Sequence, residues 1–497
     1  MKYTCTRDSG VCVSASKAIL TGISPDGGLF LPESFPAFSR EEISAMAKLG
    51  YAGRAAAVMG KFLTDFSAEE LERYTCAAYA EDRFGKNTAP VIKLSDSSYI
   101  LELFHGPTSA FKDFALQILP YLLTASARKN GVNEDIVILV ATSGDTGKAA
   151  LEGFADVDGT KICVFYPNGG TSPIQKLQMT TQKGGNVLVT AVDGNFDDAQ
   201  TGVKAIFTDA DYNQELLSSG LRLSSANSIN WGRLVPQVAY YFSAYCDLVN
   251  SDAIALGDKI NICVPTGNFG NILAGYYARC MGLPVGRLIC ASNRNNVLTD
   301  FFRTGEYSVR REFYKTTSPS MDILVSSNLE RLLYEAADRD SETVAAWMKQ
   351  LQQDGVYAIA DEEKEWLASV FTAGCADDQA AAEEIGVRFM HNHYLMDTHT
   401  AVASRVLRQY REETGDATPT VIVSTANPYK FVADVLSAVT GKDESDLDAF
   451  EAAVKLESLS GVPVPAQVDA LRTLPVLHKQ QCTRDQMAEA VFEAFGG

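Results

Sequence analysis

Apolar and polar positions between residues 96 and 300 follow two alternating patterns. Strands are predicted at four short, almost wholly apolar runs, 136–140, 162–166, 187–192 and 260–264. Helices are predicted where apolar residues recur at helical spacing, at 234–249 and 272–281. Strands that alternate with helices are typical of parallel sheets covered by helices, so this part of the chain is predicted to have an α/β fold.

The segments on either side of this region have a mainly helical pattern. Near the amino terminus, helices are predicted at 40–48 and 68–79, with a turn at Gly27 and Gly28. Toward the carboxyl terminus, three more helices are predicted, at 329–337, 342–351 and 401–412. A further strand is predicted at 420–423, and residues 444–497 form an acidic, alanine-rich tail without a recognisable motif.

Composition narrows the classes of protein to which the chain can belong. Its 497 residues carry a formal net charge of −19, which argues against a nucleic acid or an anionic membrane as a partner. The ten cysteines lack metal-binding spacing, so we expect free thiols and a cytoplasmic location. No apolar stretch fits a signal peptide or a membrane span, and the length predicts about three domains.

Lys112 is the first candidate for chemistry, because it lies between Phe111 and Phe114. Aromatic neighbours exclude water from an ammonium group, which lowers its pKa and favours the neutral, nucleophilic amine. A lysine that forms a Schiff base needs this neutral form. A surface lysine whose stem lies on apolar neighbours would have the same local sequence, so this segment alone does not decide.

Two further segments have the sequence of an anion-binding turn between a strand and a helix. One is 141–147, Ala-Thr-Ser-Gly-Asp-Thr-Gly, and the other is 264–271, Val-Pro-Thr-Gly-Asn-Phe-Gly-Asn. Backbone N–H groups at a helix start bind phosphate, and glycines let the chain curl around it. A Walker-type nucleotide loop is rejected, because Thr142 replaces its first glycine and Ala149 its hydroxyl residue. Ordinary capped turns remain the alternative for both segments.

Together these segments resemble the threonine synthase family of pyridoxal-phosphate enzymes, which is of the tryptophan synthase β-subunit type. The resemblance rests on motifs at 105–114, 142–147, 227–233 and 265–270, and it extends to 3–7, 22–30, 397–402 and the strand end at 424–428. It covers residues 1 to about 440 in order, which is the span of an enzyme rather than of a chance motif.

The resemblance implies a two-lobed, fold-type II enzyme with mostly parallel sheets flanked by helices, plus an N-terminal domain. The implied parts are an N-terminal domain at 1–95, a large cofactor-binding lobe at 96–135 and 235–440, a small inserted α/β lobe at 136–234, and a C-terminal helical tail at 441–497.

The site residues are also implied by the resemblance. Lys112 would bind pyridoxal 5'-phosphate covalently and later transfer protons. The other cofactor-binding residues would be Gly267, Asn268, Phe269, Gly270 and Asn271 at the phosphate, and Thr425 at the pyridine nitrogen. The substrate-binding residues would be Ser143, Asp145, Thr146, Asn227, Ser228 and Arg233. Arginine is suited to bidentate contacts with phosphate.

The implied reaction converts O-phospho-L-homoserine and water to L-threonine and phosphate by γ-elimination and β-addition, in a monomer or homodimer. One alternative is a pyridoxal-phosphate-dependent phospho-lyase or ammonia lyase that acts on a related amino acid. Another is a relative that only binds a ligand, against which the intact Lys112 and phosphate loop argue.

Asn427 departs from the family pattern, because histidine is expected between Ala426 and Pro428, and asparagine cannot titrate. The group His391, His393 and His399 could suggest zinc, with the first two on one face of a strand. No further ligand with metal spacing completes the group, so we expect no metal site. His399 is expected near the cofactor, whereas the role of His105 is left open.

Overall fold

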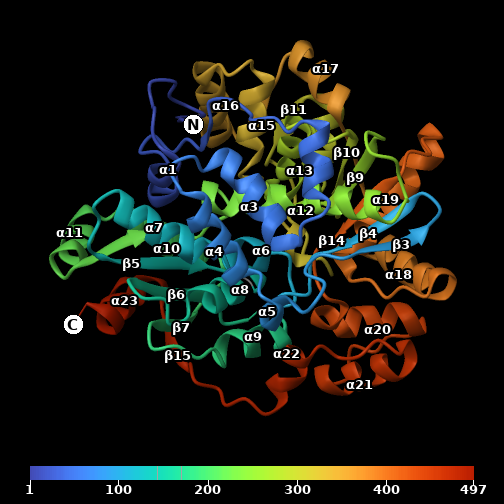
Figure 1. The fold of residues 1–497 in the computed structure, drawn as a ribbon. Coiled ribbons are helices and arrows are strands. Elements are labelled where there is room, and N and C mark those ends of the chain that lie inside the picture. Colours follow the sequence, from blue (N-terminus) through green and yellow to red (C-terminus); the bar gives the residue numbers. More distant parts are fainter. Residues whose placement is uncertain (143, 170, 497) are drawn as a thin grey trace.

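The computed structural model describes residues 1–142, 144–169 and 171–496, and it contains two larger sheets in separate halves of the molecule (Figure 1). The first sheet has six strands in the order β13-β10-β9-β14-β4-β3, and all pairs are parallel except β3 with β4. Its strands are β3 (Val91–Ser95), β4 (Ser98–Glu102), β9 (Ile260–Pro265), β10 (Val285–Ser292), β13 (Phe371–Cys375) and β14 (Thr420–Ser424).

The second sheet has five parallel strands in the order β15-β7-β6-β5-β8. Its strands are β5 (Asp135–Ala141), β6 (Thr160–Pro167), β7 (Val187–Val192), β8 (Leu221–Ser224) and β15 (Gln480–Cys482). The central strands β5 and β6 are buried almost throughout because helices cover both faces, which explains their continuous apolar runs. Every strand predicted from the apolar runs is therefore confirmed.

Helices of the amino-terminal region pack beside the six-stranded sheet, together with the antiparallel pair β1 (Tyr3–Cys5) and β2 (Phe30–Pro32). They are α1 (Ala15–Thr21), α2 (Arg40–Met46), α3 (Tyr51–Phe62), α4 (Ala68–Ala78) and α5 (Glu81–Phe84). Helices α2 and α4 begin at capping boxes, in which the serine and the glutamate three residues later satisfy the first free N–H groups.

In the described part of the chain, the small antiparallel pair β11 (Glu306–Ser308) and β12 (Val356–Ala358) and eleven helices complete the large half. These helices are α6 (Asp113–Leu116), α7 (Leu119–Lys129), α12 (Trp231–Asn250), α13 (Gly270–Cys280), α14 (Val297–Thr304), α15 (Leu329–Ala336), α16 (Ser341–Asp354), α17 (Asp361–Val370), α18 (Asp378–Asn392), α19 (Thr398–Thr414) and α20 (Val432–Thr440). Short 3-10 helices lie at η1 (Pro319–Met321) and η2 (Pro428–Phe431).

Four helices flank the five-stranded sheet: α8 (Asp145–Phe154), α9 (Pro173–Thr180), α10 (Phe196–Thr208) and α11 (Ala210–Ser218). The carboxyl-terminal segment adds α21 (Ala449–Ser460), α22 (Ala466–Asp469), η3 (Ala470–Arg472), η4 (Arg484–Gln486) and α23 (Met487–Phe495).

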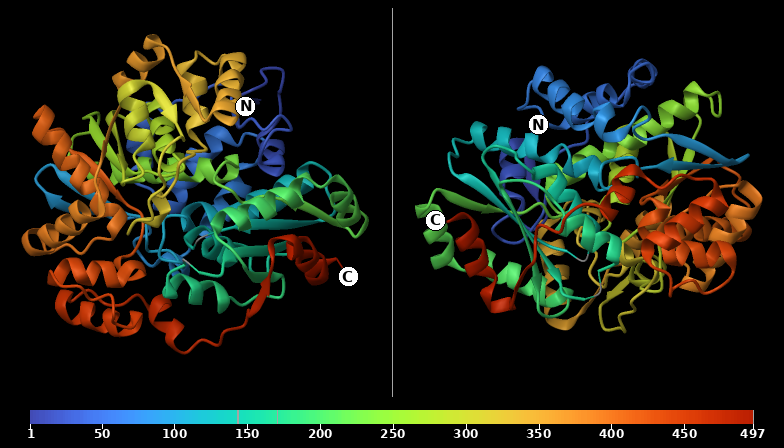
Figure 2. Two further views of the ribbon diagram at one scale, coloured as in Figure 1. Left: turned by 180° about the vertical axis from the view of Figure 1, so that it is seen from behind. Right: turned by 90° about the horizontal axis from the view of Figure 1, so that it is seen from below.

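This segment crosses from the large half to the small half of the molecule (Figures 1 and 2). Its strand β15 pairs with β7, and Met487 and Val491 of α23 pack into the apolar core beneath that sheet. The sequence Gln-Gln-Cys of β15 has no apolar alternation, so the prediction of a wholly helical tail missed this strand.

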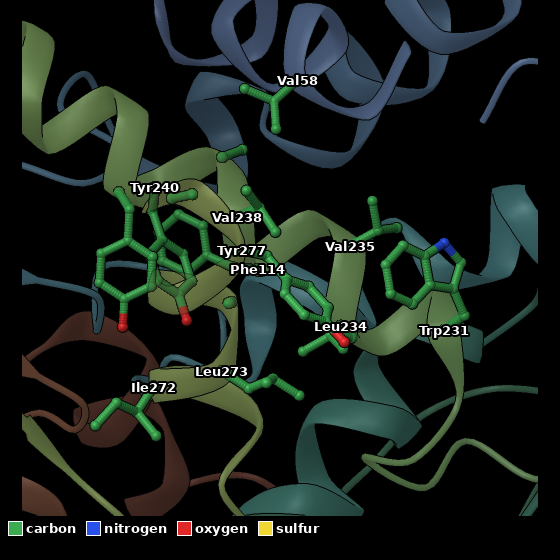
Figure 3. Packing of buried hydrophobic residues seen from close by; sticks show 14 of the residues in the cluster. Val58, Phe114, Trp231, Leu234, Val235, Val238, Tyr240, Ile272, Leu273 and Tyr277 are labelled. Carbon is green, nitrogen blue, oxygen red and sulfur yellow. The ribbon is translucent and has the colours of Figure 1, made fainter. Parts of the chain in front are cut away.

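Helix α12 lies at the centre of the main core and is buried along nearly its whole length. Its residues Trp231, Val238 and Tyr240 lie among side chains of α3, α6 and α13 (Figure 3). The ring of Phe114 on α6 packs against Tyr240 with centroids 5.7 Å apart. Because Lys112 immediately precedes α6, this packing fixes the base of the lysine-bearing loop.

Candidate active site

The predicted loops meet because they follow neighbouring strands. Strands β4, β14 and β9 are adjacent and parallel, so their carboxyl ends share one edge of the six-stranded sheet. The loop that carries Lys112 leaves β4, the segment at Thr425 leaves β14, and the glycine loop leaves β9. The loop before α6 is docked directly on the end of β14, since the N–H of Phe111 donates to the carbonyl of Thr425 at 2.8 Å.

Lys112 lies mostly out of solvent, with 12% of its side chain exposed. Its amine is 5.1 Å from the centroid of the Phe111 ring, 3.4 Å from the hydroxyl of Ser320 and 3.9 Å from one carboxylate oxygen of Asp145. Burial lowers the pKa of Lys112 to about 8; Asp145 opposes this shift, and Lys430 contributes to it. A substantial fraction of the amine is therefore neutral near physiological pH.

Asp145, at the start of α8, joins this lysine to a second one. Its carboxylate accepts from the amine of Lys430 at 2.8 Å and from the side chain of Gln175 at 2.8 Å. Burial alone would raise the pKa of Asp145, but Lys430 and Lys112 hold it below its usual range. An ionised carboxylate repels anions and attracts cations, so Asp145 is suited to a positively charged group of a ligand.

Arg233, on α12, is a buried cation without an acidic partner among the described residues, and only 3% of it is exposed. Its Nη1 donates to the carbonyl of Ala226, but its Nε has no hydrogen-bond partner. Burial lowers the pKa of Arg233 to about 10, so the guanidinium stays charged. A buried charged group with an unused hydrogen-bond donor and no acidic partner among the described residues is suited to an anionic ligand.

The glycine loop has the geometry of an anion-binding turn. Phe269 has a left-handed backbone, with φ 63°, at the N-cap of α13. Within the described part of the chain, the N–H groups of residues 267–271 have no hydrogen-bond acceptor. A Cβ on Gly267 would lie 2.5 Å from the carbonyl oxygen of Ser320, so only glycine fits there. In contrast, the side chain of Asn271 faces inward, where its oxygen accepts from the hydroxyl groups of Tyr240 and Tyr241.

Asn427, which stands where the family pattern has histidine, has a structural role as the cap of a short helix. Its side-chain oxygen accepts from the N–H of Tyr429 at 3.0 Å and caps η2, which carries Lys430. The neighbouring Thr425 is buried, and its hydroxyl makes no hydrogen bond to another described residue. Asn427 therefore orients Lys430, and the hydroxyl of Thr425 remains available to a ligand.

Other predicted substrate residues lie at the border between the halves. Thr146 is half-buried in the first turn of α8, Ser228 is half-buried and Asn227 is exposed. The carbonyl of Ser228 accepts from Asn328, which also donates to the carbonyl of Asn268 and so connects this segment to the glycine loop. Ser143 was also predicted to bind substrate, but it lies outside the described residues.

Several side chains of the site were not predicted. They are Ser320 beside Lys112, Lys430 and Gln175 at Asp145, Asn328 at the glycine loop, and Gln467 from α22. The amide of Gln467 donates to the hydroxyl of Ser109 at 2.8 Å and to the carbonyl of Gly106 at 3.3 Å. Ser109 has a left-handed backbone with φ 59°, an unusual conformation for serine that this contact supports.

The three histidines that lie close together in the sequence, His391, His393 and His399, lie in different surroundings in the structure. His399 is buried, its Nδ1 lies 2.9 Å from Asp397, and its Nε2 accepts from the N–H of Ser320, so it lies beside the site as expected. His391 and His393 are exposed at the end of helix α18 rather than on a strand. His105 pairs with Glu102 at 2.7 Å. Within the described ranges, no three His, Cys, Asp or Glu side chains are arranged to hold a metal ion.

The arrangement can bind a multiply anionic ligand. Lys112, Lys430 and Arg233 all act on one buried region, and among the described residues that face Lys112 only the carboxylate of Asp145 has a lowered pKa. The pKa of the neighbouring Asp113 is raised by burial to about 7. The excess positive charge, the free N–H groups and a lysine that readily loses its proton suit a phosphorylated aldehyde and a phosphorylated amino acid.

Comparison with known proteins agrees with this geometry. Two protein-family models match the chain. The model described as "Threonine synthase N terminus" matches residues 2–79, and the model described as "Threonine synthase, C-terminal" matches residues 400–474. The chain is 40% identical to threonine synthase-like 1 of Homo sapiens over 438 residues, which cover 86% of the chain but only 58% of that relative. It is 38% identical to threonine synthase of Pseudomonas aeruginosa over 449 residues, 89% of the chain and 91% of that relative.

A solved structure extends the similarity to the whole fold. The crystal structure of pyridoxal-phosphate-bound threonine synthase from Brucella melitensis has a TM-score of 0.88 and 36% identity, and it covers 100% of the chain and 99% of its own. The two-lobed α/β fold with an additional N-terminal region is thus confirmed. In the described part of the chain, no helix is long and apolar enough to cross a membrane.

Proposed function

Since the chain belongs to the threonine synthase family, we propose that it converts O-phospho-L-homoserine and water to L-threonine and phosphate with pyridoxal 5'-phosphate. One observation carries the proposal above the others: a buried lysine of lowered pKa and a buried arginine without a carboxylate partner among the described residues act on the same region. The lysine suits a Schiff base, and the arginine suits a phosphate.

The residues present fit the cofactor. Lys112 would hold it covalently, the free N–H groups of residues 267–271 would bind its phosphate, and the unoccupied hydroxyl of Thr425 would face its ring nitrogen. When bound there, pyridoxal phosphate supplies an electron sink for carbanions beside the amino-bearing carbon of a substrate. Gly267 lets the loop lie against Ser320, whose hydroxyl also contacts the amine of Lys112.

Substrate binding would use opposite charges at two ends of the site. Arg233, with Asn227 and Ser228, would bind the substrate phosphate, because its guanidinium has donors left over. The carboxylate oxygen of Asp145 that faces Lys112 would attract the ammonium group of the substrate. We therefore propose that Asp145 binds the positively charged amino group of the substrate rather than its phosphate or carboxylate.

Proton transfer would fall to Lys112. Its amine, freed by the amino group of the substrate, would remove the proton at Cα and then one at Cβ. The lysine would release the first proton before it accepts the second. Phosphate would leave with one of these protons, Lys112 would return the other to Cγ, and water would add as hydroxide at Cβ and a proton at Cα. The amine would then displace the amino group of the product. The hydroxyl of Ser320 would hold the amine in place between these transfers.

The proposed boundaries of the parts remain 1–95, 96–135 with 235–440, 136–234 and 441–497. The cytosol remains the proposed compartment, which is supported by ten unbridged cysteines in the described chain. A monomer or a homodimer remains the proposed assembly.

The test is an assay of purified protein, loaded with pyridoxal phosphate, on O-phospho-L-homoserine with both products measured. Equal amounts of phosphate and threonine are expected. Phosphate with 2-oxobutyrate would show a lyase instead, and no phosphate release would mean that Arg233 binds a different substrate. Retained biological activity in Lys112→Ala would favour a non-enzymatic relative.

A further inference from the structure

Lys430 is a buried lysine with all of its donors used. The residue is 1% exposed, and its amine donates to Asp145 at 2.8 Å, to the carbonyl of Thr108 at 2.8 Å and to the side chain of Gln178 at 3.2 Å. A lysine ammonium group has three N–H donors, so these three acceptors saturate it. No donor remains for a substrate phosphate, which excludes Lys430 as a direct phosphate ligand.

The two carboxylate oxygens of Asp145 have different surroundings, because Lys430 contacts only one of them. Oδ1 accepts from both Lys430 and Gln175, whereas Oδ2 makes no hydrogen bond within the described residues and lies 3.9 Å from the amine of Lys112. A carboxylate held at one oxygen by two donors cannot rotate freely. The other oxygen is therefore aimed at the lysine.

We propose that Lys430 is a positioning residue of the reaction: it fixes Asp145 so that one oxygen faces Lys112, and its charge keeps Asp145 from binding the proton of Lys112 tightly. The inference rests on the role of Lys112 in the proposed function. A lone Asp145 at this distance would stabilise an ammonium group at Lys112 and oppose its use as a nucleophile. Lys430 offsets that attraction, and Asp145 can still attract an incoming substrate ammonium.

The ionisable groups that face Lys112 come from four elements. They are Asp145 of α8, Lys430 of η2, Arg233 of α12 and Asp113 beside it on α6. Removing the charge of Lys430 takes away a direct repulsion and also frees Asp145 to pair with Lys112. Both changes favour the protonated amine of Lys112, so they act in the same direction.

The experiment measures the protonation of Lys112 in the cofactor-free full-length protein. Acetic anhydride, an uncharged reagent, is applied in limiting amounts between pH 6 and 10, and acetylation of Lys112 is quantified by mass spectrometry. Only the neutral amine reacts, so the profile reports the titration of Lys112. In Lys430→Met we expect the labelling rate at pH 7 to fall by about tenfold, the equivalent of one pH unit.

A second variant gives the opposite sign. Asp145→Asn removes the one ionised carboxylate that favours the ammonium form, so labelling of Lys112 at pH 7 is expected to rise. A purely structural disturbance would move both profiles in the same direction, and that result, or no shift in either variant, would overturn the proposal. Because no turnover is involved, failure of the proposed reaction cannot be confused with failure of this inference.

Two controls complete the design. Lys148→Met removes another buried lysine of the small half, whose partners are Glu152 and Gln182, and should leave the profile of Lys112 unchanged. Lys430→Arg retains the charge and should keep labelling of Lys112 within about threefold of the unaltered protein. If Lys430→Met does not fold by circular dichroism, Asp145→Asn and Lys430→Arg still decide: a fall of labelling in the first, or a tenfold change in the second, contradicts the proposal.

Discussion

Nε2 of His399 accepts a hydrogen bond from the backbone N–H of Ser320 at 3.2 Å, and the hydroxyl of Ser320 lies 3.4 Å from the amine of Lys112. Since Nε2 is an acceptor, the ring hydrogen is on Nδ1, which lies 2.9 Å from the carboxylate of Asp397. His399 therefore holds the loop of Ser320 in place through this hydrogen bond, with its own ring oriented by Asp397.

This contact predicts different outcomes for two substitutions of His399. His399→Phe leaves the N–H of Ser320 without an acceptor and removes one of the donors to Asp397, which costs about 1–3 kcal/mol, so we expect kcat to fall roughly tenfold. His399→Gln keeps an acceptor and a donor and should retain more activity. Steady-state kinetics over a pH range would check both; the loss of one limb of the pH profile in His399→Gln would instead indicate acid–base catalysis.

The second prediction concerns the pH dependence of cofactor uptake. Burial is the largest cause that lowers the pKa of Lys112, to about 8, and only the neutral amine attacks an aldehyde. The rate at which the cofactor-free protein binds pyridoxal phosphate covalently should therefore rise with pH and level off above pH 8. Stopped-flow absorbance measures this rate, with Lys112→Ala as the control that forms no bond. A rate that falls between pH 7 and 8 would contradict the assignment.

Arg233→Met should weaken substrate binding and stabilise the fold. Charged hydrogen bonds contribute about 1.5–3 kcal/mol, so KM is expected to rise by roughly 10- to 100-fold. Removal of a buried cation that has no carboxylate partner among the described residues relieves a desolvation cost, so Tm should increase, by about 1 °C for each kcal/mol gained in a chain of this length. Kinetics and thermal unfolding test the two effects separately. An unchanged KM would remove Arg233 from the substrate site.

Gly267→Ala should reduce affinity for pyridoxal phosphate. The added Cβ would lie 2.5 Å from the carbonyl oxygen of Ser320, and the backbone must move at a cost of about 1–3 kcal/mol. A cofactor titration followed by absorbance should show a Kd raised about tenfold. Gly60→Ala is the matched control: its nearest neighbour would be 3.7 Å away in a helix, so cofactor binding should not change. Equal affinities in both variants would argue against a phosphate-binding role for the loop.

Gln467→Ala tests whether the carboxyl-terminal segment supports the lysine-bearing loop. Loss of the hydrogen bonds to Ser109 and Gly106 costs about 1 kcal/mol, so we expect kcat to fall about fivefold with little change in KM. Gln481→Ala, in the same segment but bonded to Asp193, should leave kcat unchanged. If both variants have the same kcat, the carboxyl-terminal segment does not support the lysine-bearing loop during catalysis.

Much of this protein is determined by short stretches of sequence. The strand Val187–Val192 was predicted with its observed bounds, because a run of β-branched and apolar residues buried on both faces is a local signal. Lys112 between its phenylalanines, the glycines of the 264–271 loop and the order of the motifs were likewise sufficient to indicate the family and the chemistry of the site.

Only the tertiary structure decided which side chains surround Lys112. Ser320 is 208 positions away from it in the chain, and Gln467 is 358 positions away from Ser109. Lys430 follows an asparagine–proline turn and has no apolar pattern that distinguishes it from a surface lysine. The strand β15 exists because the edge of β7 supplies its hydrogen bonds. Such contacts form when segments far apart in the chain pack against one another, and the pattern of apolar residues within a short stretch does not determine that packing.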